Sequence, residues 1–229
     1  MKTAAFIPIK SNSERVESKN FRKLCGRKLY EHILINALEC KAFDHIYVDT
    51  DSDEIAEYCS DMDISVISRA PHLAENSANG NDLLNYHREC CPEYDLYFQL
   101  FATAPYLRAE TISKCVTMLT TTAEHDSIMT VTKERGWYWF GDIPVNYIPT
   151  VLPRSQDAKC VIKETTGLYG ITAGALDKYK CRIGANPMFV CVDPAEAIDL
   201  DTLDDFKRAE QYSSSCSTEI PNPWIYDDE

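Results

Sequence analysis

A short basic segment follows the first apolar run of the chain. The residues from Lys10 to Lys28 include seven lysines and arginines but only two acidic residues, although the formal net charge of the whole protein is −13. Residues 4–9, just before this segment, have the composition of a buried strand. Because ligands bind at the carboxyl ends of parallel strands, the segment predicts a site for a small anion. A solvated basic loop is the alternative interpretation.

This segment would have to bind phosphate without a glycine-rich loop. It has neither the GxGxxG fingerprint nor the Walker pattern, and the whole chain has only eight glycines. Phosphate binding would then depend on lysine and arginine side chains, on the hydroxyls of Ser11 and Ser13, and on backbone N–H groups.

Two carboxylates near the end of the chain form a second candidate site. Asp199 and Asp201 lie two residues apart, so in an extended backbone they face the same way. This arrangement suits Mg²⁺, which takes one or two carboxylates together with substrate phosphates. The alternative is that Asp201 caps the helix that follows, with Asp204 and Asp205 near its positive end. The spacing leaves both interpretations open.

Together the two segments suggest one chemistry. The basic loop would bind a nucleoside triphosphate, and a carboxylate-bound metal ion would neutralise charge while the α-phosphate is attacked. Catalysis would come mainly from positioning and electrostatic stabilisation.

Composition restricts the class of protein. With 229 residues, 45% hydrophobic and 26% charged, the chain fits one globular domain. No stretch approaches the roughly 18 apolar residues of a membrane span, and residues 4–9 are too short for a signal-peptide core. We therefore expect a cytoplasmic protein without a membrane partner, and the acidic excess argues against nucleic acid. The ten cysteines have no CxxC spacing, so neither a disulfide scaffold nor a structural zinc site is expected.

Short apolar runs alternate with helical patterns along the chain. Strands are predicted near residues 4–9, 46–48, 64–67, 96–101, 128–131, 168–171 and 188–192, with helices between most of them. This alternation predicts an α/β fold with a mainly parallel sheet flanked by helices. The pattern breaks at about 134–165, where aromatic residues and prolines indicate an inserted arm. We expect a single domain over 1–212, with a last helix from Leu203 to Tyr212, and a loosely held tail over 213–229.

The stretch from Ile7 to Asn20 resembles the nucleotide-binding signature of the acylneuraminate cytidylyltransferases, which include the CMP-sialic acid and CMP-KDO synthetases. Lys10 stands where the family has arginine, and Lys19 and Asn20 match its Lys-Asn pair. Four further stretches resemble family motifs in the same order: Asp49–Ala56, Arg69–Ser77, Thr103–Arg108 and Ile198–Phe206. The last of these is similar to the family's metal-binding motif, which favours Asp199 and Asp201 as metal ligands.

The resemblance implies a Rossmann-like nucleotidyltransferase that transfers CMP from CTP to a 2-keto-3-deoxy sugar acid and releases pyrophosphate. It implies Mg²⁺ as cofactor and a homodimer whose arm is exchanged. Lys19 would be catalytic, with Lys10 and Arg15 contributing. The residues implied to bind the nucleotide are Lys10, Ser11, Asn12, Ser13, Arg15, Lys19, Asn20, Arg69 and Ser77.

The acceptor is predicted less specifically. The residues assigned to the sugar are Gln99, Thr103, Arg154, Gln156 and Tyr169. Asn12 replaces a family glycine, Phe101 stands where the family has a sugar-contacting glutamine, and Thr103 replaces the aspartate of the KDO branch. Sialic acid, its legionaminic or pseudaminic relatives and KDO are expected in that order. The alternatives are a non-sugar acid such as a phosphonate, and a nucleotide-binding homologue without turnover.

Overall fold

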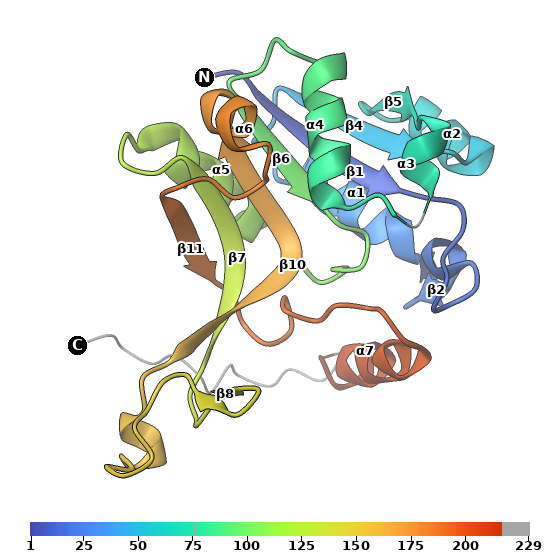
Figure 1. The fold of residues 1–229 in the computed structure, drawn as a ribbon. Coiled ribbons are helices and arrows are strands. Elements are labelled where there is room, and N and C mark those ends of the chain that lie inside the picture. The colour runs from blue at the N-terminus through green and yellow to red at the C-terminus, as the bar shows by residue number, and fades with distance from the viewer. Residues whose placement is uncertain (76, 217–229) are drawn as a thin grey trace.

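A seven-stranded sheet in the order β11-β7-β10-β6-β1-β4-β5 forms the centre of the protein (Figure 1). The computed structural model describes residues 1–75 and 77–216. The strands are β1 (Thr3–Ile9), β4 (His45–Thr50), β5 (Ser65–Ser68), β6 (Leu96–Leu100), β7 (Ser127–Glu134), β10 (Val161–Thr172) and β11 (Pro187–Cys191). The helices are α1 (Leu29–Glu39), α2 (Asp53–Ser60), α3 (Pro71–Ala74), α4 (Gly80–Cys90), α5 (Ala109–Thr121), α6 (Ala173–Tyr179) and α7 (Leu203–Cys216).

The sheet is mainly parallel, which confirms the predicted fold class. β1 pairs in parallel with β4 and β6, β4 with β5, and β11 with β7. Only β10 runs antiparallel to its two neighbours, β6 and β7. Its pairing with β7 is interrupted between Glu164 and Tyr169, and Thr166 within this interruption has a positive φ of 56°. The sequence pattern predicts only the second half of this strand, because the residues before Thr166 do not form an apolar run.

The alternating side chains of the sheet pack against different helices on its two faces. From β1, Ala5, Ile7 and Ile9 belong to the larger core, which also contains residues of α1, α2 and α5. Ala4 and Phe6 belong to a second core with residues of α4 and α6. Because successive strand residues point to opposite faces, one apolar strand contributes to both cores. A strand buried on both faces is therefore apolar throughout, as residues 4–9 are.

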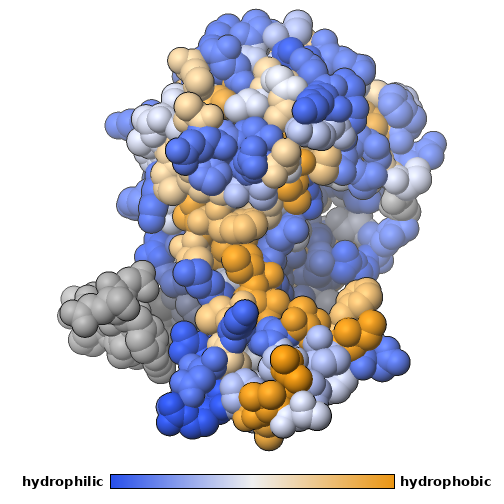
Figure 2. Space-filling model, turned by 60° about the vertical axis from the view of Figure 1, so that its left-hand side comes forward, coloured by the Kyte–Doolittle hydropathy of each residue, from blue (hydrophilic) through white to orange (hydrophobic). Residues whose placement is uncertain are grey.

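The inserted arm leaves the sheet where β7 and β10 extend beyond the other strands (Figure 1). It carries a small hairpin of β8 (Trp139–Phe140) and β9 (Ile143–Pro144), followed by the 3₁₀ turn η2 (Ser155–Asp157). Many of its large apolar side chains are exposed: Trp137, Trp139, Phe140, Ile143, Val145, Ile148, Val151 and Leu152. Figure 2 shows this hydrophobic surface at the bottom of the molecule.

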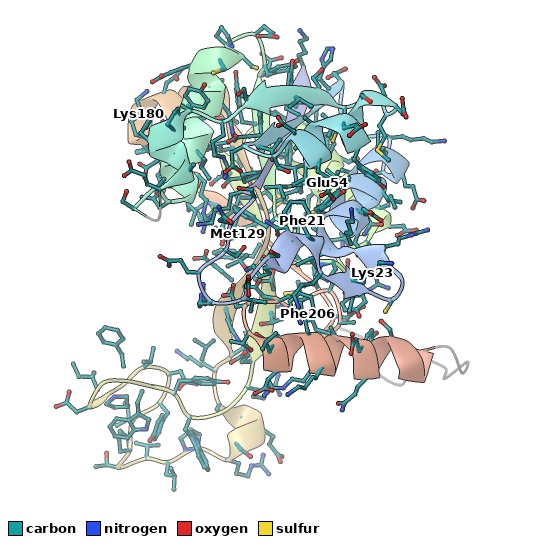
Figure 3. All side chains as sticks on the ribbon, turned by 90° about the vertical axis from the view of Figure 1, so that its right-hand side faces the viewer. Phe21, Lys23, Glu54, Met129, Lys180 and Phe206 are labelled. Atoms are coloured by element: carbon teal, nitrogen blue, oxygen red, sulfur yellow. The ribbon has the colours of Figure 1, made fainter. Side chains whose placement is uncertain are left out.

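Helix α7 packs against the basic segment rather than against the main sheet. The segment contains the 3₁₀ turn η1 (Lys19–Phe21) and the short strands β2 (Lys23–Leu24) and β3 (Arg27–Lys28). A separate apolar cluster joins the two parts, with Val16, Leu24 and Leu29 on one side and Phe206 and Ala209 on the other. Figure 3 shows Phe206 on the side of α7 that faces the loop of Lys23. This packing holds the end of the chain against the loop after β1.

The last helix is longer than predicted. Helix α7 continues past Tyr212 to Cys216, so residues 213–216 do not belong to a tail. No glycine or proline interrupts the chain between Leu203 and Cys216, and the Ser213 hydroxyl lies 2.6 Å from that of Tyr106. The rest of the predicted tail, 217–229, lies outside the described residues. Within the described part of the chain, no helix has the length and apolar character needed to cross a membrane.

Candidate active site

A cleft of about 240 Å³ opens where β1, β5 and β6 end. Its wall includes the basic segment after β1, the segment after β5 and residues 101–103 after β6. Of the predicted site residues, the cleft is lined by Lys10, Ser13, Arg15, Lys19, Asn20, Arg69 and Thr103. These residues are far apart in sequence, and the parallel sheet brings them to one edge.

Asp201 joins the two predicted sites directly. One of its carboxylate oxygens lies 3.0 Å from Lys19 Nζ and the other 2.8 Å from Arg15 Nη1. The Lys19 side chain is 14% exposed, whereas that of Arg15 is 68% exposed. Lys19 is thus held inside the cleft wall, while Arg15 is a solvent-exposed cation at its rim.

The hydrogen bonds at the start of α7 show whether Asp201 caps this helix or is available for another role. Asp205 N–H donates to Thr202 Oγ1 at 3.2 Å, and Asp205 Oδ2 accepts from Thr202 N–H at 2.8 Å. Thr202 and Asp205 therefore form the reciprocal cap at the start of the helix. The Asp201 side chain does not cap the helix and points instead to the cations of the basic segment.

Asp199 is separated from Asp201 by Leu200. Leu200 is fully buried, and its N–H donates to Thr103 O at 2.9 Å. Asp199 Oδ2 accepts a hydrogen bond of 2.8 Å from the Thr166 hydroxyl. Its second oxygen, Oδ1, is buried and has no hydrogen-bond partner among the described residues. An unpaired buried carboxylate oxygen is costly, so this atom marks a place where a cation would fit.

Arg69 is held in the cleft by a buried carboxylate. Its Nε donates to Asp49 Oδ1 and its Nη2 to the Asp49 carbonyl oxygen, both at 2.9 Å. On the other side, His87 Nε2 lies 2.8 Å from Asp49 Oδ2. Asp49 and His87 are fully buried, and Arg69 is 7% exposed. Asp49 therefore fixes the guanidinium in one orientation, with its remaining donors left for a ligand.

The protonation states in this buried group follow from its contacts. Burial would raise the pKa of Asp49, but the hydrogen bonds from His87 and Arg69 outweigh it and hold that pKa below its usual range. Burial lowers the pKa of His87 against the opposing effect of Asp49. The neutral ring donates from Nε2, since Nδ1 is buried without a partner among the described residues. The group consists of one carboxylate, one guanidinium and one neutral imidazole.

Other predicted nucleotide residues have structural contacts. The Asn20 side chain donates to the Lys10 carbonyl oxygen at 2.8 Å and so closes the loop after β1. The Ser11 hydroxyl and N–H both donate to Asp51, at 2.8 and 2.6 Å. Asn12 is exposed, and neither it nor Ser11 lines the cleft. Ser77 lines a neighbouring cavity, which shares Leu73 with the cleft wall.

The residues predicted to bind the sugar fall into two groups. Thr103, Gln99 and Tyr169 lie at or beside the cleft: Thr103 lines it, and Gln99 and Tyr169 are paired across β6 and β10. Tyr169 is buried and donates to Glu164 at 2.6 Å. Gln156 lies on η2 in the arm and Arg154 lies just before it, where Arg154 Nε pairs with Asp157 at 2.6 Å. Figure 1 shows the arm at the lower ends of β7 and β10, away from the basic segment, and neither of these two residues lines the cleft of its own chain.

Sequence reasoning missed three residues of this region: Asp49, His87 and Arg182. Asp49 lies within a recognised motif but at the end of an apolar strand, which gives no sign that it is paired. His87 falls on the apolar face of α4 with Leu83 and Leu84, and helical periodicity would have placed it in the core. Arg182 lies in a connection without any motif, so no signal in the sequence marks it.

The mainly parallel sheet with helices on both faces and the basic cleft at its carboxyl edge define a Rossmann-like α/β fold with a site suited to an anionic ligand. The sequence pattern of the family described as "Cytidylyltransferase" matches residues 4–138. The chain belongs to the cytidylyltransferase family.

Curated relatives extend the similarity beyond the matched region. N-acylneuraminate cytidylyltransferase A of Danio rerio is 24% identical over 216 residues, which cover 91% of this chain and 50% of that protein. The CMP-N,N'-diacetyllegionaminic acid synthase of Legionella pneumophila is 26% identical over 222 residues, covering 92% of this chain and 96% of that protein. This chain thus spans about half the length of the Danio rerio relative.

Solved structures have the same fold at lower sequence identity. A CMP:2-keto-3-deoxy-manno-octonic acid synthetase complexed with CTP gives a TM-score of 0.70 at 16% identity, covering 94% of this chain and 99% of that chain. A 4-diphosphocytidyl-2C-methyl-D-erythritol synthase from Anaerococcus prevotii gives 0.68 at 15% identity, covering 93% of this chain and 98% of that chain. At these identities the likeness concerns the fold alone.

The buried pairing of Arg69 predicts a large effect of Asp49→Asn on stability. The substitution leaves the Arg69 guanidinium buried without a counter-charge, so we expect a loss of about 3–5 kcal/mol in the free energy of unfolding. Urea unfolding of the purified variant measures it. Asp63→Asn, an exposed change between α2 and β5, is the matched control and should stay within about 0.5 kcal/mol of the parent. Equal stability of the two variants would contradict the assignment.

Proposed function

We propose that this protein is a CTP-dependent cytidylyltransferase that transfers CMP to a 2-keto-3-deoxy sugar acid of the sialic or legionaminic type. In the reaction, an acceptor hydroxyl oxygen forms a bond to the α-phosphorus of CTP. The bond from that phosphorus to the bridging oxygen breaks, pyrophosphate leaves, and the hydroxyl proton is released. The curated relatives act on acids of this kind, as their names state.

The observation that carries the proposal is the convergence of Lys19, Arg15 and Asp201. Lys19 and Arg15 both pair with the Asp201 carboxylate beside an open cleft, so two positive charges lie where a triphosphate would bind. The phosphates would replace Asp201 as the partner of Lys19 and Arg15. Lys10 and Arg69 line the same cleft and would contact the nucleotide as well. Preorganised cations of this kind stabilise the charge that develops on a leaving pyrophosphate.

The two carboxylates fit a magnesium ion. Asp199 contributes a buried oxygen without a partner among the described residues, and Asp201 would become available once phosphates bind Lys19 and Arg15. No group of three or more histidine, cysteine or carboxylate side chains suited to a metal occurs in the part of the chain described here. The ion would therefore take its other oxygens from substrate and water, as Mg²⁺ commonly does. When bound, it would supply charge neutralisation at the α-phosphate.

We also propose that the arm joins two copies of the chain. Its exposed aromatic and aliphatic side chains gather at the lower end of the molecule, where Figure 2 shows several hydrophobic patches, and exposed apolar residues gathered in this way mark an interaction site. Arg154 and Gln156 lie on the arm, away from the cleft of their own chain. A two-fold dimer would bring the arm of one copy to the other and would cover this surface.

The reaction is tested by pyrophosphate release from the purified protein with Mg²⁺. We expect release with CTP and one acid from a panel of N-acetylneuraminic acid, a legionaminic acid, KDO and 2-aminoethylphosphonate. ATP, GTP and UTP serve as controls and should give little release. Binding of CTP without release for any acceptor in the panel would contradict this proposal and favour a nucleotide-binding homologue.

Asp201→Asn should lower turnover roughly 100-fold or more, because it removes a charged oxygen from the proposed metal site. Stability should change by no more than about 1 kcal/mol for each ion pair lost, since Asp201 is partly exposed. Asp204→Asn is the control, because Asp204 is 73% exposed and pairs only with Lys207 among the described residues. Steady-state assays at saturating CTP compare the two. Full activity of Asp201→Asn would rule out its proposed role.

Phe140→Asp should convert a dimer into a monomer. Phe140 is 80% exposed in the single chain, so the substitution leaves the fold intact but places a charge on the apolar surface. Light scattering after size-exclusion chromatography measures the mass. Asp142→Ala, at the neighbouring exposed turn of the hairpin, should remain dimeric. A monomeric parent protein at micromolar concentration would refute the proposed interface.

A further inference from the structure

Arg182 lies between α6 and β11 and rests on two aromatic rings beside the cleft. Its guanidinium carbon is 3.7 Å from the centroid of the Tyr169 ring and 5.6 Å from that of Phe101. Within the described residues, no carboxylate forms an ion pair with it. A guanidinium stacked on a ring keeps its edge, with its N–H donors, available for a ligand.

The connection that carries Arg182 is fixed to the start of α4. Asn81 Oδ1 accepts a hydrogen bond of 3.0 Å from Arg182 N–H, and Asn85 Nδ2 donates to the Lys180 carbonyl oxygen at 3.0 Å. These bonds join segments about one hundred residues apart. On the side of this connection, both bonds are made by backbone atoms, of Lys180 and Arg182. The connection is therefore held at the start of α4 whatever the Arg182 side chain contacts.

A buried amide and a glycine lie next to the guanidinium. Gln99 is fully buried; its Nε2 donates to Gly80 O at 3.0 Å, and its Oε1 has no partner among the described residues. A Cβ at position 80 would lie 2.6 Å from Arg182 Nη1 and 3.3 Å from Gln99 Oε1. Both polar groups therefore converge on the space above Gly80, and a larger residue there would displace the guanidinium.

This cluster is continuous with the cleft. Phe101, on which Arg182 rests, lines the cleft together with Ala78 and Leu83, which flank Gly80 in sequence. Tyr169, the other ring, lies on β10, the strand whose Thr166 hydroxyl donates to Asp199 at 2.8 Å. In an acid of the proposed class the reacting hydroxyl and the carboxylate are bonded to the same carbon. A molecule with that hydroxyl near Asp199 and Asp201 would thus have its carboxylate on the same side of the cleft, where Tyr169 and Arg182 lie.

We propose that Arg182 binds the carboxylate of the acceptor and so selects acidic acceptors for this protein. The inference deepens the proposed function and rests on it for the identity of the acceptor. A planar guanidinium matches the two oxygens of a carboxylate, and the stacking on Tyr169 and Phe101 sets the plane of that contact. Arg154, which the sequence favours for this role, is 75% exposed on the arm and already pairs with Asp157.

The test compares binding of N-acetylneuraminic acid with that of its methyl ester, in the presence of a non-hydrolysable CTP analogue. Isothermal titration calorimetry should show that the parent protein binds the acid about tenfold or more tightly than the uncharged ester. Arg182→Gln should reduce this ratio to near one, with unchanged affinity for the CTP analogue. Lys178→Gln, an exposed neighbour on α6, removes the same charge and should keep the parent ratio.

Gly80→Ala provides a second variant that changes no charge. The methyl group would displace the Arg182 guanidinium, while alanine favours the helix at this position. We expect a reduced acid-to-ester ratio with an unchanged melting temperature.

The outcomes separate this inference from the proposed function. An equal affinity for acid and ester in the parent, an unchanged ratio in Arg182→Gln, or no binding of either compound overturns the role of Arg182. The parent protein could release pyrophosphate although its preference for the acid does not depend on Arg182. That result would support the proposed function and overturn the inference. An Arg182-dependent preference for the acid without any pyrophosphate release supports the inference and refutes the function.

Discussion

The ion pairs of Asp201 with Lys19 and Arg15 are the contact on which the site depends. They join residues 186 and 182 positions apart in sequence, and the apolar cluster beneath α7 holds the two segments together. In the absence of phosphate, the carboxylate stabilises cations that would otherwise repel one another across a narrow loop. The same arrangement would couple the binding of phosphate and metal, because phosphates that replaced Asp201 at the two cations would leave its carboxylate available for the proposed ion.

The antiparallel strand β10 brings the other components to this point. Its irregularity between Glu164 and Tyr169 places Thr166 against Asp199 and leaves Tyr169 facing Arg182. A regular strand would alternate these side chains between the two faces of the sheet. The same strand, paired with β7, continues into the arm. One element therefore contributes to the proposed metal site, to the proposed acceptor site and to the apolar surface proposed to join two copies.

Paired polar groups, some of them buried, keep the site in a defined shape. Asp49 orients Arg69, Asn20 closes the loop after β1, and Asp51 holds Ser11. In a parallel α/β protein the strand ends are the place where polar side chains enter the interior, because the helices cover both faces. The cost of burying these groups is offset only where each has a partner. Among the described residues four buried polar atoms have no partner: Asn85 Oδ1, His87 Nδ1, Gln99 Oε1 and Asp199 Oδ1. Asp199 Oδ1 lies where the proposed ion would bind, and Gln99 Oε1 lies beside the group proposed to bind the acceptor.

The sequence established the α/β class and the position of the basic segment, since these follow from apolar periodicity and local charge, and its motifs predicted the pair Asp199 and Asp201 as metal ligands. It also placed Lys19 and Arg15 in the site, because they lie directly after the first strand. Only the tertiary structure showed that Asp201 pairs with those cations, that Thr202 and Asp205 cap α7, and that Asp49 supports Arg69. It likewise showed that Arg154 lies away from the cleft of its own chain while Arg182 rests beside it. The physical reason is that hydrogen bonds and ion pairs depend on distance in space, and for residues far apart in the chain that distance is set by how the sheet and helices pack.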